Sequence, residues 1–230
     1  MTRLIVLQHE AEAPLGLLTR PDLPTHTVHA YRGDEVPGAT DGMGGLVVLG
    51  GGMNAYADAE HPWLTPTKNL IRQAVADGTP TLLLCLGHQL GAVAMGGRVE
   101  VGTSLGPLWG TAPMGLTEEG VADPLLGRLD DARVIHWNSD VVADTPPGAV
   151  VLARDPRGAV QALRYGERAW SIQAHPEADA DIVQAWADKQ DADMQEQAQA
   201  ALTDVRRHGP AIATAWRPVL DAFLDLVLQR

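Results

Sequence analysis

Residues 81–90, with the sequence TLLLCLGHQL, constrain the fold more than any other part of this chain. Leu82 to Leu84 are typical of a buried strand in a parallel sheet, and residues 87–95 are typical of a helix that ends at the following glycine pair. A strand that turns sharply into a helix lifts one side chain above the edge of the sheet. That side chain belongs to Cys85, the only cysteine among the 230 residues.

The position of Cys85 leaves two interpretations open. The first amides of a helix favour a thiolate and can hold an oxyanion, which makes this cysteine a candidate nucleophile. A free cysteine is usually a small buried hydrophobe of the core instead. These ten residues do not decide between the two.

The alternation of strands and helices in the first half predicts an α/β fold with a mostly parallel central sheet flanked by helices. Residues 98–175 carry short apolar segments between Gly and Pro turns, which predicts a smaller antiparallel portion. The expected strands are 4–7, 27–29, 45–49, 82–84, 132–135, 150–153, 159–163 and 169–173, and the expected helices are 63–77 and 87–95.

We expect residues 1–180 to form one domain and residues 181–230 to form a C-terminal helical extension packed on it. Residues 182–205 have few large apolar side chains, so we expect an exposed helical segment there. The last part of the chain has one apolar helical face that should pack against the domain. This face consists of Trp216, Leu220, Phe223, Leu224 and Val227.

Composition excludes several classes of function. The net charge is −12 without a basic patch, which argues against a nucleic-acid partner. No apolar run reaches the roughly 18 residues that span a bilayer, and one cysteine cannot form an internal disulfide, so we expect a cytoplasmic protein. His26 and His29 have no partner at metal-binding spacing, and no P-loop pattern is present. We therefore expect no metal and no cofactor.

A second strand end carries the groups that a cysteine nucleophile needs. His175 follows an expected strand, and Glu177 comes two residues later, across a stiff proline. Strand ends of a parallel sheet converge on one crevice, so His175 can take the thiol proton while Glu177 fixes its tautomer. Residues 50–52 are three glycines after a third strand, and their uncovered amides can complete an oxyanion hole.

These motifs together resemble the class I (triad) glutamine amidotransferases over about residues 1–180. The family's G-x-C-x-G-x-Q motif matches residues 83–89 except at its first glycine, and its H-P-E motif matches residues 175–177. Residues 50–52 match its oxyanion strand. Residues 136–140 and 145–148 look like the W-x-x-D and P-P-G stretches of stand-alone members similar to the amidotransferase domain of GMP synthase.

The resemblance implies a flavodoxin-like fold and hydrolysis of the glutamine side-chain amide by Cys85, His175 and Glu177. The substrate would be glutamine, and the released ammonia would pass to a synthetase partner. The resemblance also assigns supporting roles. Gly51 and Leu86 would donate to the oxyanion, and Gln89, Asp140 and Gly52 would bind the substrate.

The chain departs from the family pattern at three places. Leu83 replaces the small glycine two residues before the cysteine, so the packing beneath the turn must differ. Residues 108–111, LWGT, replace an E-x-G-[WY] stretch that lines the glutamine pocket in many relatives. Ala174 stands where relatives usually have Phe, which opens space beside the base.

Three hypotheses follow. The first is a glutamine amidotransferase that supplies ammonia to a synthase partner. The second keeps the triad but acts on a γ-glutamyl peptide or conjugate without a partner, as the altered stretch at residues 108–111 suggests. The third is a catalytically quiet scaffold. Outside the triad, we expect His88 to lie on the helix, and we favour a solvated loop over a place in the crevice for His9 and Glu10.

Overall fold

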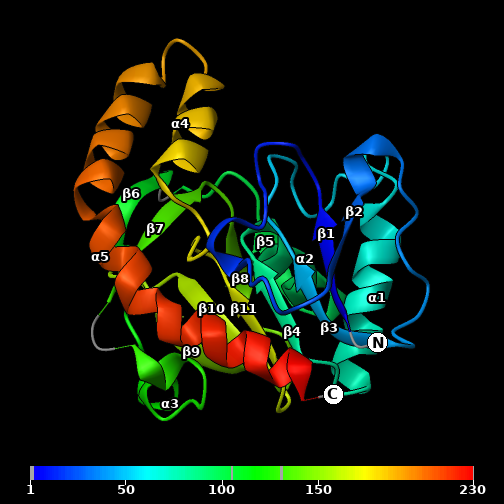
Figure 1. Ribbon diagram of the computed structural model, residues 1–230. Helices are drawn as coiled ribbons and strands as arrows, with labels where there is room; N and C mark the ends of the chain where they lie inside the picture. Colours follow the sequence, from blue (N-terminus) through cyan, green and yellow to red (C-terminus); the bar gives the residue numbers. More distant parts are fainter. Residues whose placement is uncertain (1–2, 105, 130–131, 230) are drawn as a thin grey trace.

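A nine-stranded mixed sheet forms the centre of the protein (Figure 1). The computed structural model describes residues 3–104, 106–129 and 132–229. The strand order is β2-β1-β3-β4-β11-β10-β8-β5, and β9 pairs with β10. The strands are β1 (Arg3–Gln8), β2 (Thr25–His29), β3 (Met43–Val48), β4 (Thr81–Leu84), β5 (Arg98–Glu100), β8 (Val141–Asp144), β9 (Val150–Arg154), β10 (Val160–Tyr165) and β11 (Ala169–Ile172).

The strands from β2 to β11 are parallel, and they bring their carboxyl ends to one edge of the sheet. In this region Leu82 of β4 pairs with Val47 of β3 on one side and with Trp170 of β11 on the other. β3, β4 and β11 are buried along their whole length, as expected for parallel strands with both faces covered.

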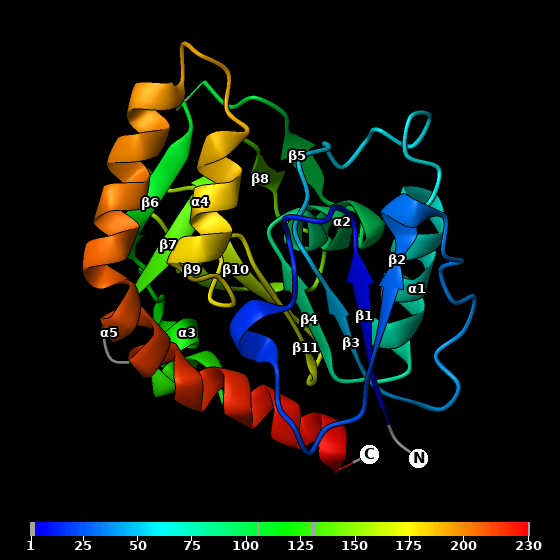
Figure 2. The same cartoon turned by 45° about the horizontal axis from the view of Figure 1, so that its top comes forward.

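Alternating side chains of these strands enter two separate cores. Leu46, Val48 and Leu83 join the core beneath α1 (Leu64–Ala76) and α2 (Leu86–Ala94). Val47 and Leu82 join the opposite core beneath the last helix, α5 (Gln195–Leu228). Figures 1 and 2 show α1 and α2 on one side of the sheet and the final part of α5 on the other. The period of two along each strand therefore produces a three-layer α/β/α arrangement.

A separate antiparallel ribbon of β6 (Leu108–Pro113) and β7 (Arg133–Asn138) lies beside the sheet. The short α4 (Ala180–Asp188) and the first part of α5 stand next to this ribbon (Figure 2). The remaining short helices connect strands, and they are α3 (Glu118–Val121) and the 3₁₀ helices η1 (Gly16–Leu18), η2 (Ala30–Arg32) and η3 (Leu126–Arg128).

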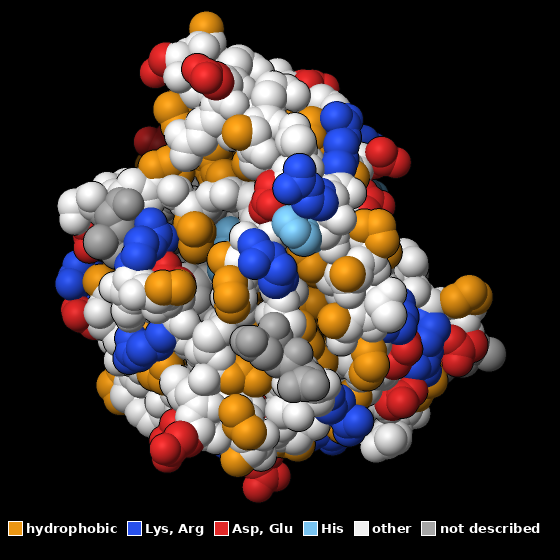
Figure 3. All heavy atoms as spheres, turned by 90° about the vertical axis from the view of Figure 1, so that its left-hand side faces the viewer, with side chains coloured by type: hydrophobic (Ala, Val, Ile, Leu, Met, Phe, Trp, Pro, Cys, Tyr) orange, Lys and Arg blue, Asp and Glu red, His pale blue; other side chains and the backbone are white. Residues whose placement is uncertain are grey.

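α5 changes direction along its length, and this bend lets one helix serve two parts of the molecule (Figure 1). It contains Pro210 and Pro218, and a proline inside a helix removes one backbone hydrogen bond and bends the axis. The first part of α5 packs on β6 and α4, and the last part covers the sheet. The outer face of α5 carries interspersed acidic and basic side chains (Figure 3).

The predicted α/β architecture is confirmed, including the parallel sheet, the antiparallel portion and the apolar face of α5 that begins at Trp216. Each predicted strand exists, with ends shifted by a few residues. β5, β6 and β8 were not predicted: β5 and β8 have only three and four residues, and Gly110 and Thr111 interrupt the apolar side chains of β6. The prediction of one exposed helical segment over 182–205 is wrong: α4 ends at Asp188, and small apolar side chains of both helices are buried.

Two features are absent from residues 3–104, 106–129 and 132–229. No helix in these ranges combines the length and the apolar character that crossing a bilayer requires. No group of three or more His, Cys, Asp or Glu side chains in the same ranges is arranged to hold a metal ion.

Gly87→Ala should destabilise the fold, because a Cβ at this position would lie 2.3 Å from the backbone oxygen of Val48. α2 would have to move away from β3, at a cost of about 2 kcal/mol in the free energy of unfolding. Urea unfolding measures this change. Gly38→Ala is the control, since a Cβ there meets nothing within 4 Å. Equal stability of the two variants would contradict the close packing.

Candidate active site

Cys85 occupies a strained turn between β4 and α2. Its φ of 50° makes it the sole non-glycine residue with positive φ in the part of the chain that the structure describes. The Cys85 amide donates to the carbonyl of Ile172 at 2.9 Å, and the Cys85 carbonyl accepts from Gln89 N at 3.1 Å. Such backbone strain costs about 1–3 kcal/mol and is maintained by the surrounding structure. The predicted sharp turn at Cys85 is therefore present.

At position 83, where the family motif has a glycine, this chain has a leucine that packs closely against α2. Leu83 is fully buried. A Cβ on Gly91 of α2 would lie 2.5 Å from the Leu83 side chain, so the large leucine fits because residue 91 has no side chain. The bulk beneath the cysteine is thus accommodated on the helix, one turn and a half further along.

His175 and Glu177 lie together beside Cys85 and are both buried. His175 Nδ1 is 2.8 Å from Glu177 Oε1. The main chain fixes the histidine as well, because its amide donates to the carbonyl of Ile135 at 2.7 Å. The His175 ring lies close enough that a Cβ on Gly50 would be 3.2 Å from its Cε1 and 3.5 Å from Cys85 Cβ. The three predicted residues are therefore brought together.

The charges around His175 decide its protonation. Burial by itself lowers the pKa of His175, but the negative charges of the Cys85 sulfur and the Glu177 carboxylate outweigh burial and raise this pKa well above 6.5. A protonated imidazole between two acceptors can hold a thiolate and later release its proton to a leaving group. The arrangement suits nucleophilic attack by the Cys85 sulfur, followed by transfer of the His175 proton to the leaving group.

The glycine loop after β3 lies against the start of α2. A Cβ on Gly51 would be 3.0 Å from the Leu86 side chain, so the loop that carries one predicted oxyanion donor packs against the first residue of the helix that carries the other. The amide of Gly52 has a different partner, because it donates to Glu10 Oε2 at 3.1 Å. Glu10 therefore lies at the site, and the expectation that it belongs to a solvated loop is wrong. The contact joins two loops that lie far apart in the sequence, so no local sequence pattern predicts it.

Gln89 and Asp140 meet on the other side of the cysteine. Gln89 Nε2 points to the Asp140 carbonyl at 3.5 Å and to Gln173 Oε1 at 3.4 Å. Gln173 Nε2 in turn lies 3.7 Å from Cys85 Sγ. Burial raises the pKa of Asp140, and the amide of Gly102 donates to its carboxylate at 2.8 Å. Gln173 was missed by sequence reasoning, although it lies two residues before the identified histidine.

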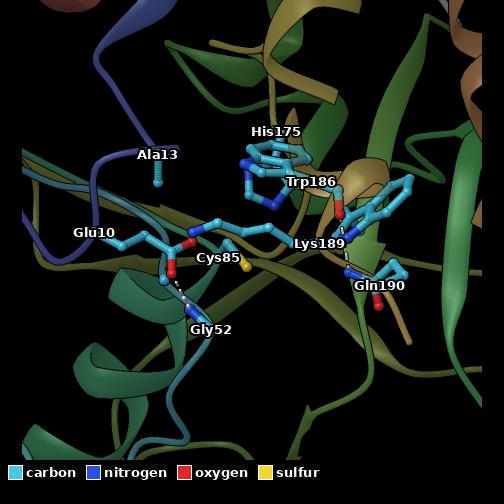
Figure 4. Close-up of a pocket in the computed structure, with 10 residues that line it drawn as sticks. Glu10, Ala13, Gly52, Cys85, His175, Trp186, Lys189 and Gln190 are labelled. Carbon is cyan, nitrogen blue, oxygen red and sulfur yellow. Dashed lines mark hydrogen bonds between the residues drawn. The ribbon is translucent and has the colours of Figure 1, made fainter. Parts of the chain in front are cut away.

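Two pockets meet at Cys85. The first, of about 190 Å³, includes the side chains of Gln89 and Asp140. The second, of about 220 Å³, lies on the side of His175 and includes Glu10 and Trp186. Figure 4 shows Glu10 and Gly52 on one side of this second pocket and Trp186 and Gln190 on the other, with Cys85 between them.

Aromatic rings form a continuous wall along both pockets. Trp109 of β6 and Trp137 of β7 stack at 4.8 Å with an interplanar angle of 7°. Trp186 of α4 lies 6.0 Å from Trp137 and 4.5 Å from the His175 ring. Trp109 belongs to the stretch that departs from the family pattern. Trp186, Lys189 and Gln190 come from beyond residue 180, and only the tertiary structure brings them to the cysteine.

The other buried histidines near the site are held neutral. Burial lowers the pKa of His9 to about 4 and that of His88 to about 3. His88 Nδ1 lies 2.7 Å from Ser171 Oγ, which ties α2 to β11. His9 Nδ1 accepts from Trp63 Nε1 at 3.1 Å, and the His9 side chain is fully buried. The expectation that His9 belongs to a solvated loop is therefore wrong.

A family model for "Glutamine amidotransferase class-I" matches residues 25–182, more than half of the chain. The chain belongs to the class I glutamine amidotransferase family. It is 30% identical over 158 residues to the glutamine amidotransferase-like protein YfeJ of Salmonella typhimurium, which covers 67% of this chain and 65% of that protein. It thus spans less than two thirds of the length of that relative.

Other relatives of this amidotransferase family point to related chemistry in those proteins. A subunit of the glutamine-hydrolysing GMP synthase of Halobacterium salinarum is 33% identical over 146 residues, covering 63% of this chain and 72% of that subunit. Gamma-glutamyl peptidase 4 of Arabidopsis thaliana is 28% identical over 142 residues, covering 60% and 55% of the two chains. The crystal structure of a glutamine amidotransferase from Thermotoga maritima superposes with a TM-score of 0.84 at 21% identity, covering 97% and 98%, which shows the shared fold.

His175 should titrate far above the ordinary histidine pKa of 6.5. The folded protein then binds this proton more tightly than the unfolded chain. The resulting stabilisation is complete below about pH 6.5 and is lost as the pH rises through the raised pKa. An NMR titration of the histidine rings measures it, and Glu177→Gln should lower the His175 pKa. The exposed Glu167→Gln is the control, and a wild-type His175 titrating near 6.5 would contradict the geometry.

Proposed function

We propose that this protein hydrolyses the side-chain amide of glutamine through a cysteinyl thioester and releases ammonia. The observation that carries the proposal is the buried set of Cys85, His175 and Glu177, with the histidine 2.8 Å from the carboxylate. Membership of the class I amidotransferase family supports it. We further propose that residues 1–180 form the catalytic domain and that residues 181–230 extend it.

The first half of the reaction uses the His175 side of the cysteine. The Cys85 sulfur attacks the amide carbon, and the oxyanion that forms is held by the amides of Gly51, in the loop after β3, and Leu86, the first residue of α2. His175 then donates its proton to the departing nitrogen. The C–N bond breaks, and ammonia leaves while the glutamyl group stays on sulfur as a thioester.

The second half regenerates the enzyme. Water loses a proton to His175 and attacks the thioester carbon, and glutamate departs as the thiol is restored. Glu177 positions the ring and offsets its charge in both halves. In the pocket on the other side, Gln89 contacts the glutamyl group, Asp140 pairs with its α-ammonium, and Gly52 contributes backbone to the wall.

Cys85→Ala should abolish ammonia release from glutamine, with a loss of at least about 1,000-fold in kcat, because no other cysteine is present to act as the nucleophile. A coupled ammonia assay measures this loss. His175→Gln should behave similarly, whereas His26→Gln, at an exposed strand residue, should leave the rate unchanged. Ammonia release by the alanine variant would overturn the mechanism. Wild type that neither turns over glutamine nor is labelled at Cys85 by a glutamine-like electrophile would favour the scaffold hypothesis.

A synthetase partner that receives the ammonia, and a cytoplasmic location, belong to the same proposal. The support for the partner is the similarity to the GMP synthase subunit of Halobacterium salinarum, whose name states the synthase to which it belongs. Co-purification of the chain with a synthetase, and stimulation of ammonia release by it, would test the partnership.

A second candidate function keeps the triad and replaces glutamine by a γ-glutamyl peptide or conjugate. The stacked Trp109 and Trp137 favour it, since they form an aromatic surface at the pocket of a chain that lacks the acid and the aromatic residue of the E-x-G-[WY] stretch at positions 108 and 111. The similarity to a gamma-glutamyl peptidase points in the same direction.

The ranking of substrates separates the two functions. If the second candidate holds, kcat/KM for γ-glutamyl dipeptides should exceed that for glutamine, and Trp109→Ala should lower it by about tenfold through the loss of stacking area. The exposed Tyr56→Ala serves as a control for loss of an aromatic ring elsewhere. Faster turnover of free glutamine would return the assignment to the first function.

A further inference from the structure

The pocket on the His175 side of Cys85 is much larger than an ammonia leaving group requires. It measures about 220 Å³, whereas a cavity that holds one water-sized molecule needs about 10–15 Å³ on the same measure. Ala13, Trp137 and Trp186 contribute apolar surface, and Glu10 and Lys189 contribute charges. A pocket of this size and lining can hold an organic group attached to the leaving nitrogen.

The role of this pocket follows from the proposed hydrolysis at Cys85, and the inference rests on that function. The glutamyl group occupies the pocket of Gln89 and Asp140. The scissile carbon sits at Cys85, which both pockets share. The leaving nitrogen therefore faces His175, and any substituent on it extends into the second pocket, which we name the amine pocket.

The charges at the amine pocket are not balanced. The Lys189 side chain extends over the pocket (Figure 4), and its Nζ forms an ion pair with Glu12 Oε2 at 2.5 Å. Glu10 accepts a hydrogen bond from the amide of Gly52 at 3.1 Å. No Lys, Arg or His within the described ranges forms an ion pair with Glu10. Glu12 therefore offsets the charge of Lys189, and the carboxylate of Glu10 adds a negative charge at the pocket.

The aromatic lining favours the same sign of ligand. The rings of Trp137 and Trp186 lie 6.0 Å apart with an interplanar angle of 47°, and both line the amine pocket. Indole faces attract cations, and tryptophan does so more strongly than other aromatic residues. Figure 4 shows Glu10 on the opposite side of the pocket from Trp186, so a cation between them would meet a carboxylate and an aromatic ring.

We propose that the amine pocket binds leaving groups that carry a second positive charge, so that γ-glutamyl amides of diamines or polyamines are substrates. The Cys85 sulfur forms a thioester with the γ-carbonyl carbon. The C–N bond breaks with its electron pair on nitrogen, which takes the proton of His175 and leaves as the free diamine. Water then hydrolyses the thioester to glutamate and restores the thiol.

Three amides of matched length test the charge preference. γ-Glutamyl-1,4-diaminobutane carries a terminal cation, γ-glutamyl-pentylamide is its neutral counterpart, and γ-glutamyl-4-aminobutanoate ends in an anion. The expected kcat/KM for the cationic amide exceeds that for the neutral amide by about tenfold, and the anionic amide is the poorest. Glutamate release measures all three. Equal rates for the cationic and neutral amides, or the highest rate for the anionic amide, would overturn the proposal.

Glu10→Gln isolates the charge, because the amide oxygen of glutamine can still accept from Gly52. This variant should bring the ratio of cationic to neutral amide close to one. Glu35→Gln removes the same charge from an exposed residue outside the pocket and should keep the wild-type ratio. An unchanged ratio in Glu10→Gln would also overturn the proposal. Wild type that hydrolyses none of the amides and is not labelled at Cys85 would instead overturn the proposed function itself.

Discussion

The strained backbone at Cys85 is the feature on which the rest of the site depends. Its φ of 50° is unfavourable for a residue with a side chain, and three contacts maintain it. Cys85 is hydrogen-bonded through its amide to the end of β11 and through its carbonyl to α2, and Gly87 lets that helix approach β3 closely. Contacts with the parallel sheet and α2 thus stabilise the unfavourable backbone conformation that holds the Cys85 sulfur above the edge of the sheet.

That placement explains why a buried acid and base are tolerated nearby. An isolated charge at the depth of Glu177 would cost several kcal/mol, but the carboxylate faces the His175 ring at 2.8 Å. The neighbouring histidines at positions 9 and 88 have no such partner, and burial keeps them uncharged. One of several buried imidazoles is therefore singled out for proton transfer by the charges next to it.

The last fifty residues form part of the site as well as part of the scaffold. α5 is attached to β6 through Asp204, which accepts from the amide and hydroxyl of Thr111 at 2.7 Å. α4 is attached to the loop after β1 by Trp186, whose indole donates to the Glu12 carbonyl at 2.7 Å. These contacts hold the tryptophan wall beside His175, and the wall and Glu10 then define what can lie next to the leaving nitrogen.

The sequence by itself determined the features that local patterns encode. Apolar runs marked the buried strands, the turn at Cys85 marked the nucleophile, and residues 175–177 marked the base and its partner. Gln173, Trp186 and Lys189 could not be found in this way, nor could Glu10 be placed at the site, because their positions depend on how distant segments pack. Hydrophobic periodicity specifies which face of a strand or helix is buried. Only tertiary packing decides which polar side chains from separate segments meet in one pocket, and so only the structure places the Glu10 carboxylate in the pocket beside the cysteine.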